Sequence, residues 1–135
     1  MKKTKILDTT LRDGSYAINF SFTSTDTEII CRKLDSAGLE YIEIGHGSGL
    51  NASNLGYGKT AQTDEEYMIA AKESVTNAKY GMFCIPGIAR LDDLDLANKH
   101  NMGFIRIGTD VNKVEKSEDF IKKAKKHGML VAANY

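Results

Sequence analysis

Short apolar runs alternate with amphipathic segments along the chain, and this alternation constrains the fold more than any other feature. Each run is brief and rich in residues that favour a buried β-strand. The runs lie at Lys5–Leu7, Tyr41–Gly45, Tyr80–Ile85, Phe104–Gly108 and Met129–Ala133. Because a helical segment separates each run from the next, the sequence predicts a parallel sheet whose strands are joined by right-handed helical crossovers.

Four helices are predicted between these strands, and two of them have a capping-box start. The pairs are Thr25 with Glu28 and Thr63 with Glu66. In such a pair the hydroxyl and the carboxylate each satisfy an amide that the helix leaves free. The first helix is expected to end at Gly38, since glycine readily adopts the left-handed conformation of a helix end. The other two helices are expected at about Leu91–His100 and Ser117–His127.

The order βαβαβαβαβ is typical of a (β/α)8 barrel, and the strand starts are about 30 residues apart, as in such barrels. We therefore expect an α/β fold, a partial TIM (β/α)8 barrel with about five parallel strands and four helices over residues 1–135. The alternative is a flavodoxin-like module that binds a small molecule without catalysis. That module requires the first strand to lie inside the sheet.

A five-strand part of an eight-strand barrel has two open edges and apolar surface that its neighbours would cover. We expect the chain to be the N-terminal part of a longer catalytic domain, to pair with the missing barrel half or to self-associate, and to be inactive alone.

The charge composition gives no sign of a nucleic-acid or membrane partner and leaves small neutral or acidic ligands open. Lys and Arg together number 18, as do Asp and Glu, so no net charge attracts nucleic acid or an anionic membrane. No apolar run is long enough to span a membrane, and no signal peptide is evident. Cys31 and Cys84 lack zinc-site spacing and are expected to be buried free thiols in a cytoplasmic protein.

Arg12 and Asp13 closely follow the first predicted strand, at the end where parallel α/β sheets bind ligands. A carboxylate at this end can bind a divalent cation, and a guanidinium can stabilise the negative charge of an enolate. Gly14 would allow the backbone to approach a ligand closely. Alternatively, Arg12 and Asp13 merely cap a loop.

The stretch "LDTTLRDG" resembles the signature of the DRE-TIM metallolyases, the superfamily related to 3-hydroxy-3-methylglutaryl-CoA lyase. Two further stretches, "YIEIGHGSGLNASNLGYG" and "CIPGIARLDDL", are similar to segments of its 4-hydroxy-2-oxovalerate aldolase branch. The resemblance implies a metal-dependent lyase that makes or breaks a carbon–carbon bond beside a ketone.

The resemblance also implies roles for individual residues. Asp13 would bind a divalent metal, Mn or Mg, together with two histidines from a late strand of the barrel. Arg12 would stabilise an enolate, and Glu43 matches a family carboxylate near that arginine. The substrate would be a small 2-oxoacid or acyl compound, such as a 4-hydroxy-2-oxoacid that undergoes retro-aldol cleavage.

The chain departs from the family pattern in two places, at the expected base and at the expected metal-binding histidines. The branch has a histidine, its expected base, where this chain has Tyr16, and the ordinary pKa of tyrosine is about 10. We retain Tyr16 as a catalytic candidate. No H-x-H pair occurs, so the metal-binding histidines are expected to be absent from this chain.

The remaining candidates lie after later strands. His46 is expected either to contact substrate or to brace its loop, and Asn134 is expected to contact substrate. His100 and His127 fall at helix ends and are expected to have surface roles.

A rival nucleotide-binding interpretation uses "SNLGYGKT", but Ser53 occupies the position where a P-loop has its first glycine.

Overall fold

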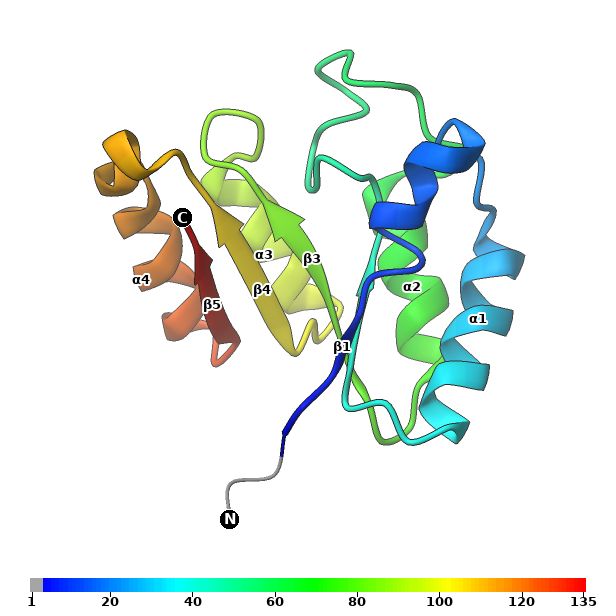
Figure 1. Cartoon of the computed structure of the whole chain (residues 1–135). Coiled ribbons are helices and arrows are strands. Elements are labelled where there is room, and N and C mark those ends of the chain that lie inside the picture. Colours follow the sequence, from blue (N-terminus) through cyan, green and yellow to red (C-terminus); the bar gives the residue numbers. More distant parts are fainter. Residues whose placement is uncertain (1–3) are drawn as a thin grey trace.

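The computed structural model describes residues 4–135, which form five strands, four α-helices and two 3-10 helices. In chain order the elements are β1 (Leu7–Asp8), η1 (Asp13–Ile18), α1 (Ser24–Ser36), β2 (Tyr41–Ile44), α2 (Asp64–Ser74), β3 (Lys79–Cys84), α3 (Leu91–Lys99), β4 (Phe104–Gly108), η2 (Val111–Ser117), α4 (Glu118–Lys126) and β5 (Leu130–Asn134). Figure 1 shows the strands curling into an open sheet with the α-helices along its outer face.

All strands are parallel and lie in the order β1-β2-β3-β4-β5. This sequential order is the one a (β/α)8 barrel requires, so the partial-barrel prediction is confirmed. The flavodoxin-like alternative is wrong, because it places the first strand inside the sheet whereas β1 pairs here with β2 at one edge.

The core lies between the sheet and the helices. Alternate residues of each strand face outward onto the helices, because successive side chains of a strand point to opposite faces. The outward set is apolar and buried, and includes Ile42, Ile44, Tyr80, Met82, Ile105 and Ile107. The other set lines the opposite, inner face of the sheet, where a complete barrel has its interior.

Helix α2 begins as predicted. The Thr63 hydroxyl accepts from the Glu66 amide, and the Glu66 carboxylate accepts from the Thr63 amide. The capping box predicted at Thr25 and Glu28 is wrong. Helix α1 begins two residues earlier, with the capping box formed by Thr23 and Asp26. Both pairs fit the sequence pattern, and once the earlier pair starts the helix, the later threonine lies within its first turn.

The two edge strands differ from the interior ones. Strand β1 is only two residues long and starts later than the predicted Lys5–Leu7. Strand β5 is largely exposed, and its inner-face residue Leu130 is 51% exposed. Within residues 4–135, neither β1 nor β5 has a second strand neighbour.

The segments that follow the strands gather at one end of the sheet, which is the carboxyl end of its parallel strands. They comprise η1, the loop 45–63, the turn 85–90 and η2 (Figure 1). Cys31 and Cys84 are buried and free, as predicted. Within the described part of the chain, no helix has the length and apolarity needed to cross a membrane.

Candidate functional site

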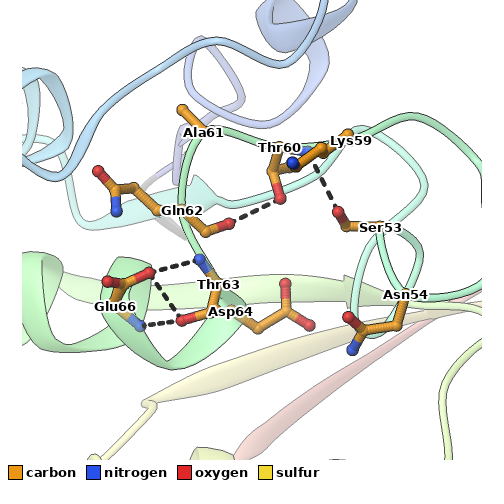
Figure 2. A pocket seen from close by; sticks show the side chains of 9 residues that line it. All are labelled: Ser53, Asn54, Lys59, Thr60, Ala61, Gln62, Thr63, Asp64 and Glu66. Atoms are coloured by element: carbon orange, nitrogen blue, oxygen red, sulfur yellow. Dashed lines mark hydrogen bonds between the residues drawn. The ribbon is translucent and has the colours of Figure 1, made fainter.

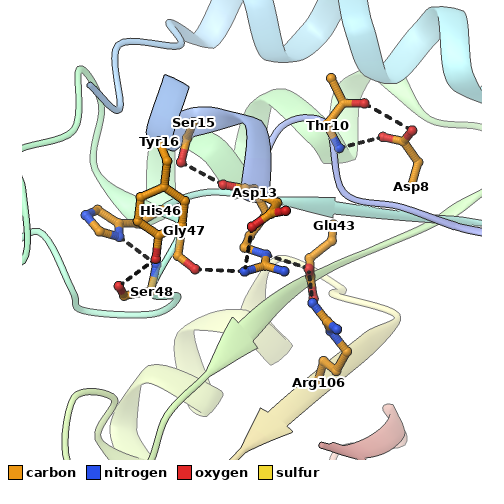
Figure 3. A network of polar contacts seen from close by, with 11 residues as sticks. Asp8, Thr10, Asp13, Ser15, Tyr16, Glu43, His46, Gly47, Ser48 and Arg106 are labelled. Atoms are coloured by element: carbon orange, nitrogen blue, oxygen red, sulfur yellow. Dashed lines mark hydrogen bonds and ion pairs between the residues drawn. The ribbon is translucent and has the colours of Figure 1, made fainter. Parts of the chain in front are cut away.

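A buried carboxylate joins two arginines on the inner face of the sheet. The Glu43 side chain is fully buried, and its Oε2 accepts from Arg12 Nε at 2.8 Å. Arg106 donates to the same carboxylate through Nε at 2.9 Å and through Nη2 at 2.7 Å. Figure 3 shows the side chains of Glu43 and Arg106 pointing toward each other. We call Arg12, Glu43 and Arg106 the arginine–glutamate cluster.

The alternation of strand side chains explains this placement. Glu43 lies between two residues that pack against helices, so its own side chain faces inward. Its register partner on β3 is Gly81, where a Cβ would collide with Phe104. Gly81 therefore leaves room for the Phe104 ring, which is level with Glu43, and Arg106 reaches Glu43 from the next inner position of β4.

Arg12 reaches the cluster from a tight turn after β1. The Asp8 carboxylate accepts from the Thr10 amide at 3.0 Å, and the Thr9 carbonyl accepts from the Asp13 amide at 2.7 Å. The turn folds the chain back over β2, where Arg12 Nη1 also donates to the Gly47 carbonyl at 3.1 Å. Arg12 therefore links β1, β2 and the loop after β2.

Phe83 provides an apolar floor for both guanidiniums. Its ring centre lies 5.0 Å from Arg12 Cζ and 4.9 Å from Arg106 Cζ, which is within cation–π range. Two guanidiniums meet one buried carboxylate here, and the second carboxylate in contact with them, that of Asp13, is exposed and 3.6 Å from Arg12 Nη1. Because solvent screens Asp13 more than the buried Glu43, the buried part of the cluster stays positive and suits an anionic ligand.

Asp13 lies beside the cluster but faces solvent. Its Oδ1 is 3.6 Å from Arg12 Nη1, and its side chain is 63% exposed. Asp8, the nearest other acidic residue of the turn, uses both carboxylate oxygens to hold Thr10. Residues 4–135 contain no group of three acidic, histidine or cysteine side chains placed to hold a metal. The described donors therefore do not form a complete metal site.

Tyr16 stands at the mouth of the site, with its hydroxyl 3.0 Å from Ser48 Oγ. A Cβ at position 47 would collide with the Tyr16 ring, so Gly47 is required for this approach. The ring also contacts Phe20 edge to face. Around Gly14, in contrast, a Cβ would meet nothing within 4 Å, so the protein itself does not require a glycine there, and the close approach to a ligand stays a prediction.

His46 braces the loop after β2. It is fully buried and stacked on Phe20, with a ring-centre distance of 4.0 Å. Its Nδ1 accepts from the Ser48 amide, so the Nε2–H donates to the Gly58 carbonyl. Burial lowers the pKa of His46, in keeping with a neutral ring. Because both ring nitrogens are engaged, the structure favours the bracing interpretation over substrate contact.

Asn134 lies at the carboxyl end of β5, opposite Gly108 of β4. It lines a hollow together with Phe83 and Thr109, and its carbonyl accepts from the Thr109 amide. Since Phe83 is also the floor of the arginine–glutamate cluster, Asn134 lies at the same end of the sheet as the cluster, and its contact with substrate stays a prediction.

The other two histidines lie at helix ends. The expectation of a surface role is wrong for His100, whose side chain is 11% exposed and bonds Glu65 at 2.7 Å. The reason is that α2 packs against α3 and covers the end of that helix. His127, at the end of α4, is 2.9 Å from Asp95 of α3.

Figure 2 shows the hollow beside "SNLGYGKT", which lies at the start of α2. Its lining includes the carboxylates of Asp64 and Glu66, which would repel a phosphate. The amides of Thr60, Thr63 and Glu66 already donate to side chains of the chain itself. The loop 45–63 also separates β2 from α2, unlike a P-loop, so nothing in the hollow supports nucleotide binding.

Arg106 is the functional candidate that the sequence interpretation missed. The signal was a charged residue in the middle of the apolar strand "FIRIG", at a position that alternation assigns to the inner face. A largely buried arginine in a strand needs an anionic partner, and Glu43 is the acidic residue on the inner face of β2, although the strand register places it level with Phe104 rather than with Arg106.

Comparison with known proteins places the chain in a family. A family model described as HMGL-like matches residues 3–132. The chain belongs to the HMGL-like family. The resemblance to the DRE-TIM metallolyases is thereby confirmed, and the similar proteins include several 4-hydroxy-2-oxovalerate aldolases.

Two curated relatives illustrate the range of activities in this HMGL-like family. A 4-hydroxy-2-oxovalerate aldolase of Desulfitobacterium hafniense is 41% identical over 133 residues, which cover 98% of the chain and 40% of the relative. An oxaloacetate decarboxylase of Mycobacterium tuberculosis is 42% identical over 127 residues, which cover 94% and 37%. The chain therefore spans about two fifths of the length of these relatives.

A solved structure supports the fold of this HMGL-like chain. The carboxyl transferase domain of Rhizobium etli pyruvate carboxylase, determined with pyruvate, matches with a TM-score of 0.75 and 18% identity. The match covers 98% of this chain and 24% of that one. At this identity the similarity establishes the fold alone.

Proposed function

We propose that this chain supplies the first half of an active site that cleaves a carbon–carbon bond of a 2-oxoacid through an enolate. The observation that carries the proposal is the Arg12 guanidinium, held by buried Glu43 at the carboxyl end of the sheet. Curated relatives named as an aldolase and a decarboxylase support the same reaction class.

Arg12 is proposed to bind the substrate and stabilise the enolate. Its Nε and Nη1 are used by Glu43 and Gly47, and no contact of Nη2 is found within the described part of the chain. A donor fixed in place before the reaction stabilises developing negative charge without reorganisation. Glu43 and Arg106 are positioning residues, since they hold this guanidinium and do not themselves need to contact substrate.

In a retro-aldol reaction, a base removes the proton from the 4-hydroxyl of the substrate. The bond between C3 and C4 then breaks, its electrons form the enolate of pyruvate, and an aldehyde leaves. We propose Tyr16 as the residue that contacts this hydroxyl, with Ser48 as its hydrogen-bond partner at 3.0 Å. The enolate is finally protonated at C3 to give pyruvate.

Asp13 is proposed to supply one oxygen ligand to a divalent cation, Mn or Mg. Its exposed carboxylate is of the type that binds such a cation. When bound, the cation would act as a Lewis acid at a substrate oxygen. Since the described residues do not complete the site, we propose that the histidine ligands come from the missing barrel half, which pairs with β1 and β5.

We also propose that the protein is cytoplasmic and that this chain is inactive by itself. The two buried free thiols are compatible with a reducing compartment. Covering the open strands by the missing half, or by self-association, would also bury the exposed inner face of β5.

The test is reconstitution of the site. The chain is mixed with the C-terminal part of the Desulfitobacterium aldolase that it does not match, and pyruvate release from 4-hydroxy-2-oxopentanoate is followed. We expect activity only in the mixture, with a loss of at least about 100-fold in Tyr16→Phe. Tyr57→Phe is the matched control, because Tyr57 is about as exposed as Tyr16 and takes no part in the hydrogen bonds of the cluster.

Decarboxylation is the second candidate, favoured by the 42% identical oxaloacetate decarboxylase. Loss of carbon dioxide from oxaloacetate breaks the bond between C3 and C4 and leaves the same pyruvate enolate, but no hydroxyl proton has to be removed. A decarboxylase would therefore tolerate Tyr16→Phe. In the reconstituted mixture, oxaloacetate turnover that survives Tyr16→Phe without any aldol cleavage would favour this candidate.

A further inference from the structure

Two connected hollows lead away from the arginine–glutamate cluster across the carboxyl end of the sheet. The inner hollow, of about 280 Å³, starts at Phe83 and is lined by residues that follow β3, β4 and β5. The outer hollow, of about 230 Å³, is lined by Ile85, Pro86, Thr109, Asp110, Lys113 and Lys116. Ile85, Thr109 and Asp110 line both hollows, so the two adjoin, and the inner one reaches the cluster at the Phe83 ring beneath the guanidiniums. We call the two hollows together the path.

The outer end of this path has an excess of positive charge. Lys113 and Lys116 come from η2, and neither forms an ion pair within the described part of the chain. Asp110 is the acidic residue of the lining, and its Oδ1 is already held by the amide and the side chain of Asn112. Two lysines and one carboxylate therefore give the lining of the outer hollow a net charge of +1.

Thr109, at the junction of the hollows, has an unsatisfied hydroxyl. Its Oγ1 is buried and has no hydrogen-bond partner within the described residues. Buried polar atoms are nearly always bonded, so an orphaned hydroxyl between two hollows calls for an explanation. Rotation about χ1 exchanges the hydroxyl and the methyl group of a threonine, and it would let the hydroxyl serve a ligand in the path.

We propose that this path binds an acidic group at the far end of the substrate, so that the preferred substrate is a 2-oxoacid with a second, distal carboxylate. The inference rests on the proposed function, in which Arg12 binds the 2-oxoacid end. Lys113, Lys116 and the Thr109 hydroxyl then contact the distal carboxylate. Because this group lies beyond the scissile bond, it stays on the aldehyde product of a retro-aldol reaction.

The test compares ligands that differ only at their far end. NMR titration of the chain uses 2-oxoglutarate and 2-oxoadipate, each against the analogue in which an amide replaces the distal carboxylate. Pyruvate reports on the Arg12 end alone. We expect each diacid to bind about tenfold more tightly than its amide, the size of one good charged hydrogen bond.

Variants locate the origin of that preference. The double change Lys113→Gln and Lys116→Gln should abolish it and leave pyruvate binding unchanged. Lys72→Gln with Lys125→Gln is the matched control. Both lysines are exposed on other helices, and replacing them removes the same charge. Thr109→Val, which keeps the shape but removes the hydroxyl, should reduce the preference without lowering stability.

The possible outcomes separate the two proposals. Equal binding of diacids and amides, or a preference that survives loss of both lysines, would overturn the distal site while Arg12-dependent pyruvate binding kept the proposed function intact. Failure of pyruvate and of both diacids to bind would overturn the two together. An unchanged preference in Thr109→Val would contradict the part assigned to the hydroxyl.

Discussion

Glu43 and Arg12 lie 31 positions apart in the chain, yet the buried carboxylate of one accepts from the Nε of the other at 2.8 Å. This contact ties the turn after β1 to the centre of β2 and fixes the guanidinium at the carboxyl end of the sheet. Arg106 joins the same carboxylate from β4, so one buried acid organises three segments.

Replacing Glu43 should destabilise the fold strongly. Glu43→Gln leaves Arg106 without a counter-charge and Arg12 with only the exposed Asp13, and removing one partner of a buried ion pair costs about 3–5 kcal/mol. Urea unfolding followed by circular dichroism measures the change. Glu73→Gln on the exposed face of α2 is the control and should stay within about 0.5 kcal/mol. Equal free energies of unfolding for the two variants would show that the cluster does not hold these three segments together.

Position 47 should not tolerate a side chain, whereas position 14 should. Gly47→Ala forces the Tyr16 ring away from the loop, since the added methyl would overlap it, and overpacking of this kind costs about 1–3 kcal/mol. Gly14→Ala meets open space within the 3-10 helix η1 and should be neutral or stabilising by up to about 1 kcal/mol. The free energy of unfolding of each variant, measured in urea, distinguishes them. A greater loss of stability in Gly14→Ala than in Gly47→Ala would contradict the placement of Tyr16.

Both cysteines should be unreactive while the protein is folded. Burial raises the pKa of Cys31 and of Cys84 to about 12. The thiolate is the reactive form, and almost none is present at pH 8. A chromogenic disulfide reagent should therefore label neither thiol at pH 8 in the native protein and both in urea. Rapid labelling of the native chain would be inconsistent with the core described.

Asp35 should make stability fall in acid. Desolvation raises the pKa of its carboxyl, but the amides of Ala78, Thr76 and Asn77 outweigh it, and the net pKa lies below the ordinary value of 3.8. The unfolded chain thus binds this proton at higher pH than the folded one. The stabilisation is complete above about pH 5 and is lost as the pH falls below 3.8 through the folded pKa.

The variant Asp35→Ala isolates this effect. It leaves three amides without their acceptor and should cost about 1–3 kcal/mol at neutral pH. The difference from the wild type should stay constant between about pH 5 and 7 and shrink in stronger acid. A difference that does not change with pH would mean that the carboxylate charge plays no part.

The strand and helix pattern was predictable because its cause is local. Apolar runs, Gly38 and the box at Thr63 signal their elements within a few residues, and the order of the elements then fixes a parallel sheet. The start of α1 was misplaced because two overlapping threonine–acid pairs satisfy the same rule, and only the folded chain selects Thr23.

The site was only partly predictable because its contacts are long-range. Arg12 and Asp13 were found from their place after a strand, and Glu43 from the family resemblance. Arg106 lies 63 positions from Glu43, on a strand that is not its direct neighbour, so pairing them requires knowing the order and register of β2, β3 and β4. The bracing role of His46 likewise depends on Gly58, which follows it by 12 positions in an irregular loop.

The most direct test of the account is the binding of oxalate, a stable analogue of the pyruvate enolate, by NMR titration of the chain. We predict that Arg12→Lys, which keeps the charge but not the geometry of the guanidinium, weakens binding about tenfold or more, and that Arg12→Met abolishes it. Arg32→Met, at an exposed arginine of α1, should leave binding unchanged. Oxalate binding that is equally strong in the wild type and in Arg12→Met would contradict the central claim.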